Sequence, residues 1–203
     1  MYLVNSEGEI INQWFKLKKH YAEGFIYKNL LKENFILPTS VVIRKEVYNQ
    51  VGGFDPSIIN ADDYDLWLRI AKSYPIGLIN EPLVKWRIHD FNHSKNLPLM
   101  KNNVLKVYEK QIAEEDNDWE ARRILREKLS EEYFHLGKLN FGKELIKGTK
   151  DKFLRSLNYG FHMKVLINYL LTFLPFHFVL VLFKIKSRLM KRGTAGKIMS
   201  VSR

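Results

Sequence analysis

Cysteine is absent from all 203 residues, which excludes disulfide bonds and thiolate chemistry from this chain. A chain without cysteine suits a reducing compartment, so we expect a cytoplasmic location. The C-terminal end has no acidic residues: ten Lys or Arg residues and no Asp or Glu follow Asp151. Long apolar runs are scarce as well, and residues 165–183 are the exception. These absences divide the chain into a globular part and a basic, apolar tail.

The net charge of +11 is placed unevenly along the chain. Residues 1–95 hold 12 Lys or Arg against 11 Asp or Glu, whereas residues 96–203 hold 21 against 11. A basic tail can bind nucleic acid or an anionic membrane surface. Because Phe and Leu fill the same tail and no Gly- or Arg-rich pattern accompanies the charge, we expect a membrane partner and no nucleic acid.

Residues 165–183 are mostly apolar and carry no formal charge, with Lys164 before them and three basic residues within 184–188. This length approaches what is needed to cross a bilayer core of roughly 30 Å. Asn168 and the central Pro175 argue against a simple membrane span. Basic residues flank both ends of the segment, so they do not indicate which end would face the cytoplasm. We therefore expect two short helices, bent at Pro175, on the inner face of the cell membrane. A bilayer span and a buried helical hairpin in a larger complex stay open as alternatives.

Turn signals cut the first 95 residues into short elements. The pattern predicts two strands around a turn at residues 6–8 and then a helix, a strand and a helix, over about 24–33, 36–43 and 44–51. A further helix begins at the acidic run after residue 61 and ends at Tyr74-Pro75, because a residue before proline avoids the helical conformation. Two strands are predicted after it, over 76–79 and 83–88.

Helical periodicity takes over from Leu97. The sequence therefore predicts an α/β fold with a mixed sheet and short helices, followed by an all-α C-terminal region. The expected domains are an α/β domain over 1–95, a helical extension over 96–160, and a hydrophobic, basic tail over 161–203.

Asp62, Asp63 and Asp65 crowd the first turn of the predicted helix. Acids in this position commonly cap free N–H groups and suit the positive end of the helix dipole. Asp63-x-Asp65 also has the form of a metal-binding pair, but a two-residue pattern is weak evidence. Spacing alone leaves both a structural and a catalytic role open.

The motifs of this region, in their order and spacing, closely resemble the acceptor-side half of family 2 glycosyltransferases of the GT-A fold. The matching blocks are Gly52-Gly53-Phe54-Asp55, Asp62–Arg69, Glu81-Pro82-Leu83, and Arg87-x-His89 with Asn92 and Ser94. The resemblance covers Met1 to Lys95. The acidic pair, usually Glu-Asp in the family, is Asp62-Asp63 here. The family's nucleotide-binding half, which ends in a metal-binding Asp-x-Asp, has no counterpart before Gly52.

The resemblance implies an inverting transferase, in which an acceptor hydroxyl attacks the anomeric carbon of a nucleotide-sugar. It implies Asp63 as the catalytic base, and we expect the helix N-terminus to keep the pKa of this carboxyl low. It implies Mg²⁺ or Mn²⁺ at the leaving diphosphate, with His89 as the metal ligand supplied by this chain. The implied substrate-binding residues are Asp62, Asp65, Arg87, Asn92 and Ser94.

The expected function is therefore part of an inverting glycosyltransferase that assembles cell-surface polysaccharide or another glycan. Its substrates would be a nucleotide-sugar donor and a glycan or lipid-linked acceptor. The donor half would come from an N-terminal portion that is truncated or separately encoded, and we expect the chain alone to be inactive. The alternative is a non-catalytic, membrane-associated module that keeps the acceptor-side fold.

Overall fold

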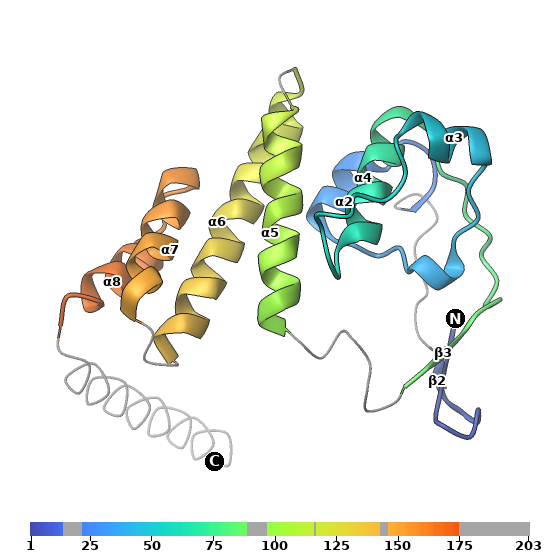
Figure 1. Cartoon of the computed structure of the whole chain (residues 1–203), viewed down its shortest axis with the longest axis horizontal. Helices are drawn as coiled ribbons and strands as arrows, with labels where there is room; N and C mark the ends of the chain where they lie inside the picture. Colours follow the sequence, from blue (N-terminus) through green and yellow to red (C-terminus); the bar gives the residue numbers. More distant parts are fainter. Residues whose placement is uncertain (14–21, 89–96, 116, 143–145, 175–203) are drawn as a thin grey trace, which may run out of the picture. The chain divides into compact units, whose positions relative to one another are not determined.

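The computed structural model describes residues 1–13, 22–88, 97–115, 117–142 and 146–174. Within these residues, three strands and seven α-helices form a small α/β region followed by helices, which confirms the predicted fold class (Figure 1). The chain divides into two compact units, unit 1 over Met1–Glu132 and unit 2 over Tyr133–Arg203. The predicted domain boundaries after residues 95 and 160 stay predictions.

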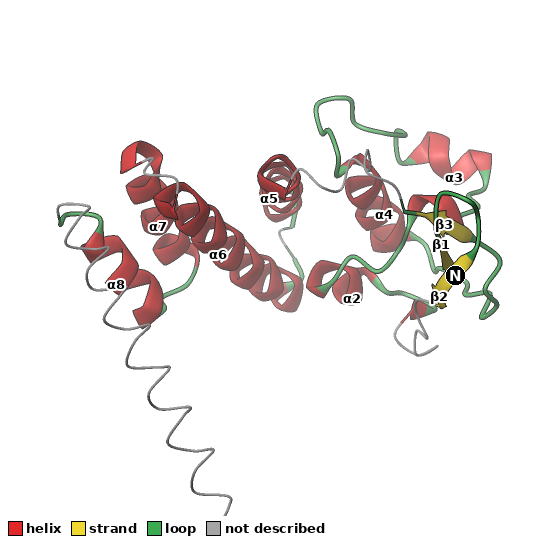
Figure 2. Ribbon diagram, turned by 90° about the horizontal axis from the view of Figure 1, so that it is seen from below, coloured by secondary structure: helices red, strands yellow, loops and turns green. Residues whose placement is uncertain are grey.

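A small mixed sheet lies in unit 1. Strand β1 (Tyr2–Val4) pairs antiparallel with β2 (Ile10–Gln13) and parallel with β3 (Lys85–Arg87), so the strand order is β2-β1-β3 (Figure 2). The turn between β1 and β2 contains Gly8 at a φ of 90°, which an L side chain rarely adopts. The parallel pairing brings β3 beside the first residues of the chain.

Four short elements and two longer helices complete unit 1. They are α2 (Tyr27–Lys32), the 3₁₀ helix η1 (Pro38–Ser40), α3 (Lys45–Gln50), α4 (Asp62–Ser73), α5 (Leu97–Ala113) and the first part of α6 (Trp119–Gly142). Helix α4 packs against α2 and α5 (Figure 1). The hydroxyl of Tyr64 on α4 donates a 2.7 Å hydrogen bond to the carbonyl of Leu30 on α2. Its ring meets that of Tyr108 on α5 edge to face, with centroids 5.9 Å apart.

Helix α4 begins and ends where the sequence predicts. Its buried face carries Leu66 and Leu68, both fully buried, and each such side chain stabilises the fold by about 1.5–3 kcal/mol. The helix stops at Ser73 because Tyr74, the residue before Pro75, is extended, with φ −129° and ψ 143°. The start of α4 is thus held by a packed apolar face, which fixes the direction of the acidic residues in its first turn.

Two predicted strands are wrong. Residues 36–43 contain the 3₁₀ turn of η1, and residues 76–79 form only an isolated antiparallel bridge between Ile76 and Gly24. A strand requires a ladder of backbone hydrogen bonds to a neighbour. Among the described residues no such neighbour lies along these two segments, so their strand-like sequences stay extended and largely unpaired.

Unit 2 contains the last part of α6, α7 (Ile146–Tyr159) and α8 (Met163–Leu171). Its apolar cluster joins one residue from each helix, namely Phe134, Phe153 and Val165. Gly137 on α6 allows this packing, since a Cβ there would lie 2.5 Å from the Phe153 ring. In the described part of the chain, no helix has both the length and the apolar character that a membrane span requires. The predicted bend at Pro175 lies outside the described residues.

Candidate functional site

Asp63 lies in the first turn of α4 and is partly buried. Its Oδ1 accepts a 2.7 Å hydrogen bond from the backbone N–H of Tyr64. Burial raises the pKa of the Asp63 carboxyl above its ordinary value of 3.8, and the neighbouring charge of Asp62 adds to the rise. The expected low pKa is therefore wrong, because desolvation outweighs the favourable hydrogen bond at the helix start.

A carboxylate with a raised pKa takes up a proton more readily than an ordinary aspartate does. General bases in enzymes are commonly tuned in this direction by burial and by a neighbouring like charge. Asp62 and Asp63 supply both, since two adjacent carboxylates lie at one helix terminus and one of them is partly withdrawn from water. The first turn of α4 is thus chemically suited to accept a proton.

Asp65, the third acid of this turn, points into the protein. It is fully buried, and Oδ2 accepts a 2.9 Å hydrogen bond from Nε of Arg69 on the next turn of α4. Nζ of Lys110 on α5 lies 3.1 Å from Oδ1. This geometry gives Asp65 a place in an ion-pair network, and its contact with substrate stays a prediction.

The same network holds the loop that precedes α4. Arg69 donates hydrogen bonds to the carbonyls of Val51 and Gly53, the latter at 2.6 Å. Lys110 also pairs with Asp55, with 2.8 Å between Nζ and Oδ2, and this hydrogen bond lowers the pKa of the Asp55 carboxyl. The loop, α4 and α5 are thus tied together by two cations. The i to i+4 spacing of Asp65 and Arg69 signals one of these contacts, whereas nothing in the local sequence signals Lys110.

Arg87 serves the sheet in this structure. It ends β3, and its Nη1 donates hydrogen bonds to the carbonyl oxygens of Ser6 and Asn5, the latter at 3.3 Å. The side chain thereby anchors the turn between β1 and β2, while its contact with substrate stays a prediction. His89, Asn92 and Ser94 lie outside the described residues.

The described residues do not by themselves fit a divalent cation. In this part of the chain no three His, Asp, Glu or Cys side chains are grouped so that they could hold a metal ion. Asp62 and Asp63 offer two carboxylates, and the carboxylate of Asp65 is engaged by two cations. Two carboxylates are the protein's share of many Mg²⁺ sites, in which substrate phosphates and waters supply the remaining ligands. The metal therefore stays a prediction.

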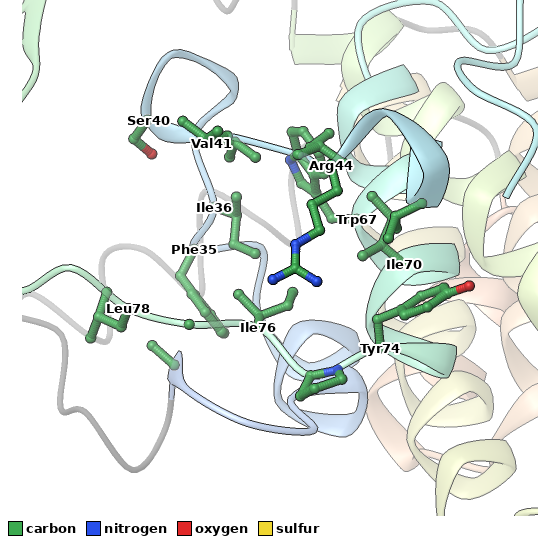
Figure 3. A pocket seen from close by; sticks show the side chains of 16 residues that line it. Phe35, Ile36, Ser40, Val41, Arg44, Trp67, Ile70, Tyr74, Ile76 and Leu78 are labelled. Carbon is green, nitrogen blue, oxygen red and sulfur yellow. The ribbon is translucent and has the colours of Figure 1, made fainter. Parts of the chain in front are cut away.

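An open pocket of about 500 Å³ lies beside α4, and no residue of the acidic turn lines it. Its walls come from residues 35–47, from Trp67 and Ile70 on α4, and from residues 74–78 (Figure 3). Most of the lining side chains are apolar. The polar exceptions include the hydroxyls of Ser40 and Tyr74 and the guanidinium of Arg44, which extends between Trp67 and Ile76 in Figure 3. Trp67 is only 4% exposed, so it belongs to the core.

Comparison with known proteins gives one distant likeness. The chain is 28% identical over 109 residues to an uncharacterized glycosyltransferase, MJ1057, of Methanocaldococcus jannaschii. The match covers 53% of this chain and 36% of the relative, so the chain spans about a third of the length of the curated protein that it matches. No family model and no solved structure matches the sequence. The likeness supports a protein of glycosyltransferase kind.

Proposed function

We propose that this chain is the acceptor-side part of an inverting, nucleotide-sugar-dependent glycosyltransferase of family 2 and the GT-A fold. The observation that carries the proposal is Asp63, a partly buried carboxylate of raised pKa in the first turn of α4. The distant likeness to a glycosyltransferase supports the same class of protein. The pathway we propose is the assembly of a cell-surface polysaccharide or another glycan.

Asp63 acts on the acceptor in this proposal. A sugar hydroxyl is a poor nucleophile, so a carboxylate within hydrogen-bond reach must take its proton as the new bond forms. The acceptor oxygen attacks the anomeric carbon, the bond to the nucleoside diphosphate breaks, and the diphosphate leaves with the electron pair. The hydroxyl proton moves to Asp63. Asp65, Arg69 and Lys110 act indirectly, because they hold α4 and the preceding loop in place.

The donor, and the cation that neutralises the leaving diphosphate, need groups beyond those described here. We therefore propose that the nucleotide-binding part of the transferase supplies the missing carboxylates and holds Mg²⁺ or Mn²⁺. When bound, the cation would supply charge neutralisation at the diphosphate. His89 is proposed as the ligand added by this chain.

The test is a transfer assay on two proteins, the 203-residue chain and a fusion of that chain with the part of the Methanocaldococcus relative that lies outside the match. Release of nucleoside diphosphate is measured with a panel of nucleotide-sugars, acceptor glycans and Mn²⁺. We expect no turnover by the chain alone and turnover by the fusion. Asp63→Asn should lower kcat of the fusion by about 10²–10⁴-fold and leave donor affinity nearly unchanged. The matched control is Asp151→Asn, an exposed acid of α7 outside the proposed chemistry.

Three results would contradict the proposal. Mn²⁺-dependent transfer by the 203-residue chain alone would show that its own acids form the metal site. Full activity of the Asp63→Asn fusion would show that Asp63 is not the catalytic base. A fusion in which Asp63→Asn weakens donor binding and not kcat would place this carboxylate at the diphosphate.

We also propose that the C-terminal region lies on an anionic membrane surface. Four exposed apolar side chains on and just after α8 are spaced by four, three and four residues, which places them along one side of the helix: Met163, Ile167, Leu170 and Leu174. The opposite side is anchored in unit 2 through Val165, which is buried. A helix that presents an apolar stripe beside basic residues is suited to the interface of a charged bilayer.

Vesicle sedimentation tests this part of the proposal. The full chain should pellet with vesicles that contain about a third anionic lipid, and high salt should release part of it. Ile167→Glu should reduce the bound fraction because it places a charge in the stripe, whereas Leu154→Glu, an exposed change on α7, should leave it unchanged. Protein that stays in the supernatant with anionic vesicles would refute membrane association.

A further inference from the structure

We infer that α8 lies flat in the headgroup layer of an anionic membrane, and that Lys164 and Lys150, one on each flank of the helix, bind the phosphate groups of anionic phospholipids. This inference rests on the membrane part of the proposed function, and it adds the orientation of the helix and the side chains that hold the lipid. It does not depend on the transfer reaction. The apolar stripe on and just after α8 consists of four exposed side chains: Met163, Ile167, Leu170 and Leu174.

Helix α8 is fixed to unit 2 by one side. Val165 in its first turn is 1% exposed, and Thr172, just after its last turn, is 5% exposed. These two residues are separated by about two helical turns, so they lie on the same side of the helix. Helix α7 packs against α8 (Figure 2). Because both ends of the helix are held by this side, the apolar stripe on the opposite side faces outward along its whole length.

A cation lies on each flank of the apolar stripe. With about 3.6 residues per turn, Lys164 lies about 90° around the helix from the stripe on one flank, and Phe173 lies about 90° from it on the other. Nζ of Lys150 on α7 lies 4.0 Å from the centroid of the Phe173 ring, which places this ammonium group on the second flank. Lys164 belongs to the first turn of α8, whereas Phe173 follows its last turn. The two ammonium groups therefore lie on opposite flanks and at opposite ends of the helix.

Aromatic rings position both ammonium groups. Nζ of Lys164 lies 5.4 Å from the centroid of the Phe134 ring, and the ammonium group of Lys150 rests on a ring as well. A ring face attracts an ammonium group without neutralising its charge. In the described part of unit 2, Asp151 is the one acid, and it pairs with Arg155. No ion pair among the described residues engages Lys150 or Lys164, so their charges are available to an anionic partner.

An anionic membrane matches this surface in charge and in the order of its layers. The described part of unit 2 holds six Lys or Arg residues against one acid, a balance of +5, which favours an anionic partner. In a bilayer the phosphate groups lie next to an apolar layer, as the two cations lie next to the apolar stripe. The apolar stems of the lysines let their ammonium groups reach the phosphates while the stripe enters the apolar layer. Since the cations lie at both ends of α8, both ends lie at the level of the phosphates, and the helix is flat.

Site-directed spin labelling measures the orientation of α8. Because the chain has no cysteine, one cysteine introduced into the full chain carries one nitroxide label. On phosphatidylcholine vesicles that contain about a third phosphatidylglycerol, labels at Met163→Cys and Leu174→Cys should lie about 5–10 Å below the phosphates, at depths that agree within about 5 Å. An end-on helix would separate the two labels in depth by about 16 Å, given a rise of about 1.5 Å per residue.

The control label is at Glu127→Cys, an exposed acid of α6, and it should stay in water. A difference in depth above about 5 Å between the labels at Met163→Cys and Leu174→Cys would overturn the flat orientation. Labels at these two positions that stay in water on the anionic vesicles would overturn the inference as well.

Binding to the same vesicles measures the role of the two lysines. Lys164→Gln and Lys150→Gln should each lower the affinity of the full chain by about fivefold, and the double change should lower it by about 25-fold. The matched control is Lys106→Gln, which removes the same charge from an exposed lysine of α5 and should change the affinity less than about twofold. Equal effects of Lys106→Gln and Lys164→Gln would reduce the attraction to net charge and overturn the inference.

Vesicles of phosphatidylcholine alone separate lipid binding from a packing role of the lysines. On these vesicles Lys164→Gln and Lys150→Gln should bind as the parent does, because no anionic headgroup is present. An equal loss of affinity on both kinds of vesicle would make the lysines structural and overturn the inference. A full chain that binds no anionic vesicle would refute the membrane part of the proposed function together with the inference, whereas binding that is insensitive to both lysines would remove the inference alone. The transfer assay decides the catalytic proposal independently.

Discussion

The ion-pair network around Asp65 gives the sharpest test of how unit 1 is held together. The perturbation is Arg69→Met, which keeps the aliphatic length of the side chain and removes its charge and its donors. Asp65 is fully buried and Arg69 is 16% exposed, so the change leaves a buried carboxylate with Lys110 as its remaining charged partner. It also removes the hydrogen bonds to the carbonyls of Val51 and Gly53.

Removal of one partner from a buried ion pair costs about 3–5 kcal/mol, and we expect Arg69→Met to lie in this range. Lys110→Met should cost about 1–2 kcal/mol, because the lysine is 27% exposed and Arg69 still faces the carboxylate. Double replacement by Asp65→Leu and Arg69→Met should cost about 1–3 kcal/mol less than the sum of the single changes. Total stabilities of domains are about 5–15 kcal/mol, so the first change alone removes a large share.

Urea unfolding followed by tryptophan fluorescence measures these free energies of unfolding. The four tryptophans of the chain stand at positions 14, 67, 86 and 119, all within unit 1, so this signal reports on unit 1 alone. The matched control is Arg123→Met, which breaks an ion pair with Glu127 in which both side chains are more than half exposed. It should change the stability by less than about 0.5 kcal/mol.

The reasoning fails if Arg69→Met costs no more than Arg123→Met. It also fails if the single changes at Asp65 and Arg69 add up exactly in the double variant, since partners in one network must couple. A change in the denaturant slope would point to a different unfolding reaction and would require a second probe.

Three further predictions follow from the same structure. Asp63→Asn should make unit 1 more stable than the parent at pH 7. The raised pKa of Asp63 means that its charged form costs stability as pH rises above the ordinary value of 3.8, so the difference in urea midpoint should vanish below that value. The control is Glu7→Gln, at an exposed acid outside α4. The pKa of Asp55 is lowered, so its pairing with Lys110 stabilises the fold above about pH 3.8, and this stabilisation is lost as pH falls further. Lys110→Met should therefore make the loss of stability in acid less steep. An equal dependence of stability on acid pH in Lys110→Met and the parent would count against the pair. Gly137→Ala should destabilise unit 2 by about 1–3 kcal/mol, because the added methyl group meets the Phe153 ring. Hydrogen exchange of the backbone amides in α7 should become faster. The control is Gly77→Ala, which should be tolerated because no atom lies within 4 Å of the added methyl group.

The elements of unit 1 that depend on local signals were predictable. Helix α4 has an acidic first turn, an apolar face and a terminating Tyr74-Pro75, and each of these acts within a few residues. The segments 36–43 and 76–79 were predicted as strands because their composition favours strands. They are not strands in this structure because a strand depends on a neighbour, and sequence composition says nothing of whether a neighbour is present.

The candidate site was predictable in part. The acidic turn could be located from sequence, and its residues lie together at the start of α4. The direction of Asp65 could not, because it depends on a residue far away in the chain, Lys110 on α5. The rise in the pKa of Asp63 could not either, because it depends on burial in the folded structure. The i to i+4 spacing of Asp65 and Arg69 was the available sign that this acid has a structural partner.

The inward direction of Asp65 has a consequence for how mutational data on the acidic turn must be read. Three aspartates within four positions invite replacement one by one, and loss of product is commonly taken as the mark of a catalytic group. Replacement of Asp65 would release α4 and the loop before it, so a loss of product in that variant would report unfolding and not the loss of a catalytic group. The informative replacement is the one that lowers product formation while the protein melts no earlier than its parent, and the proposed function predicts that signature for Asp63.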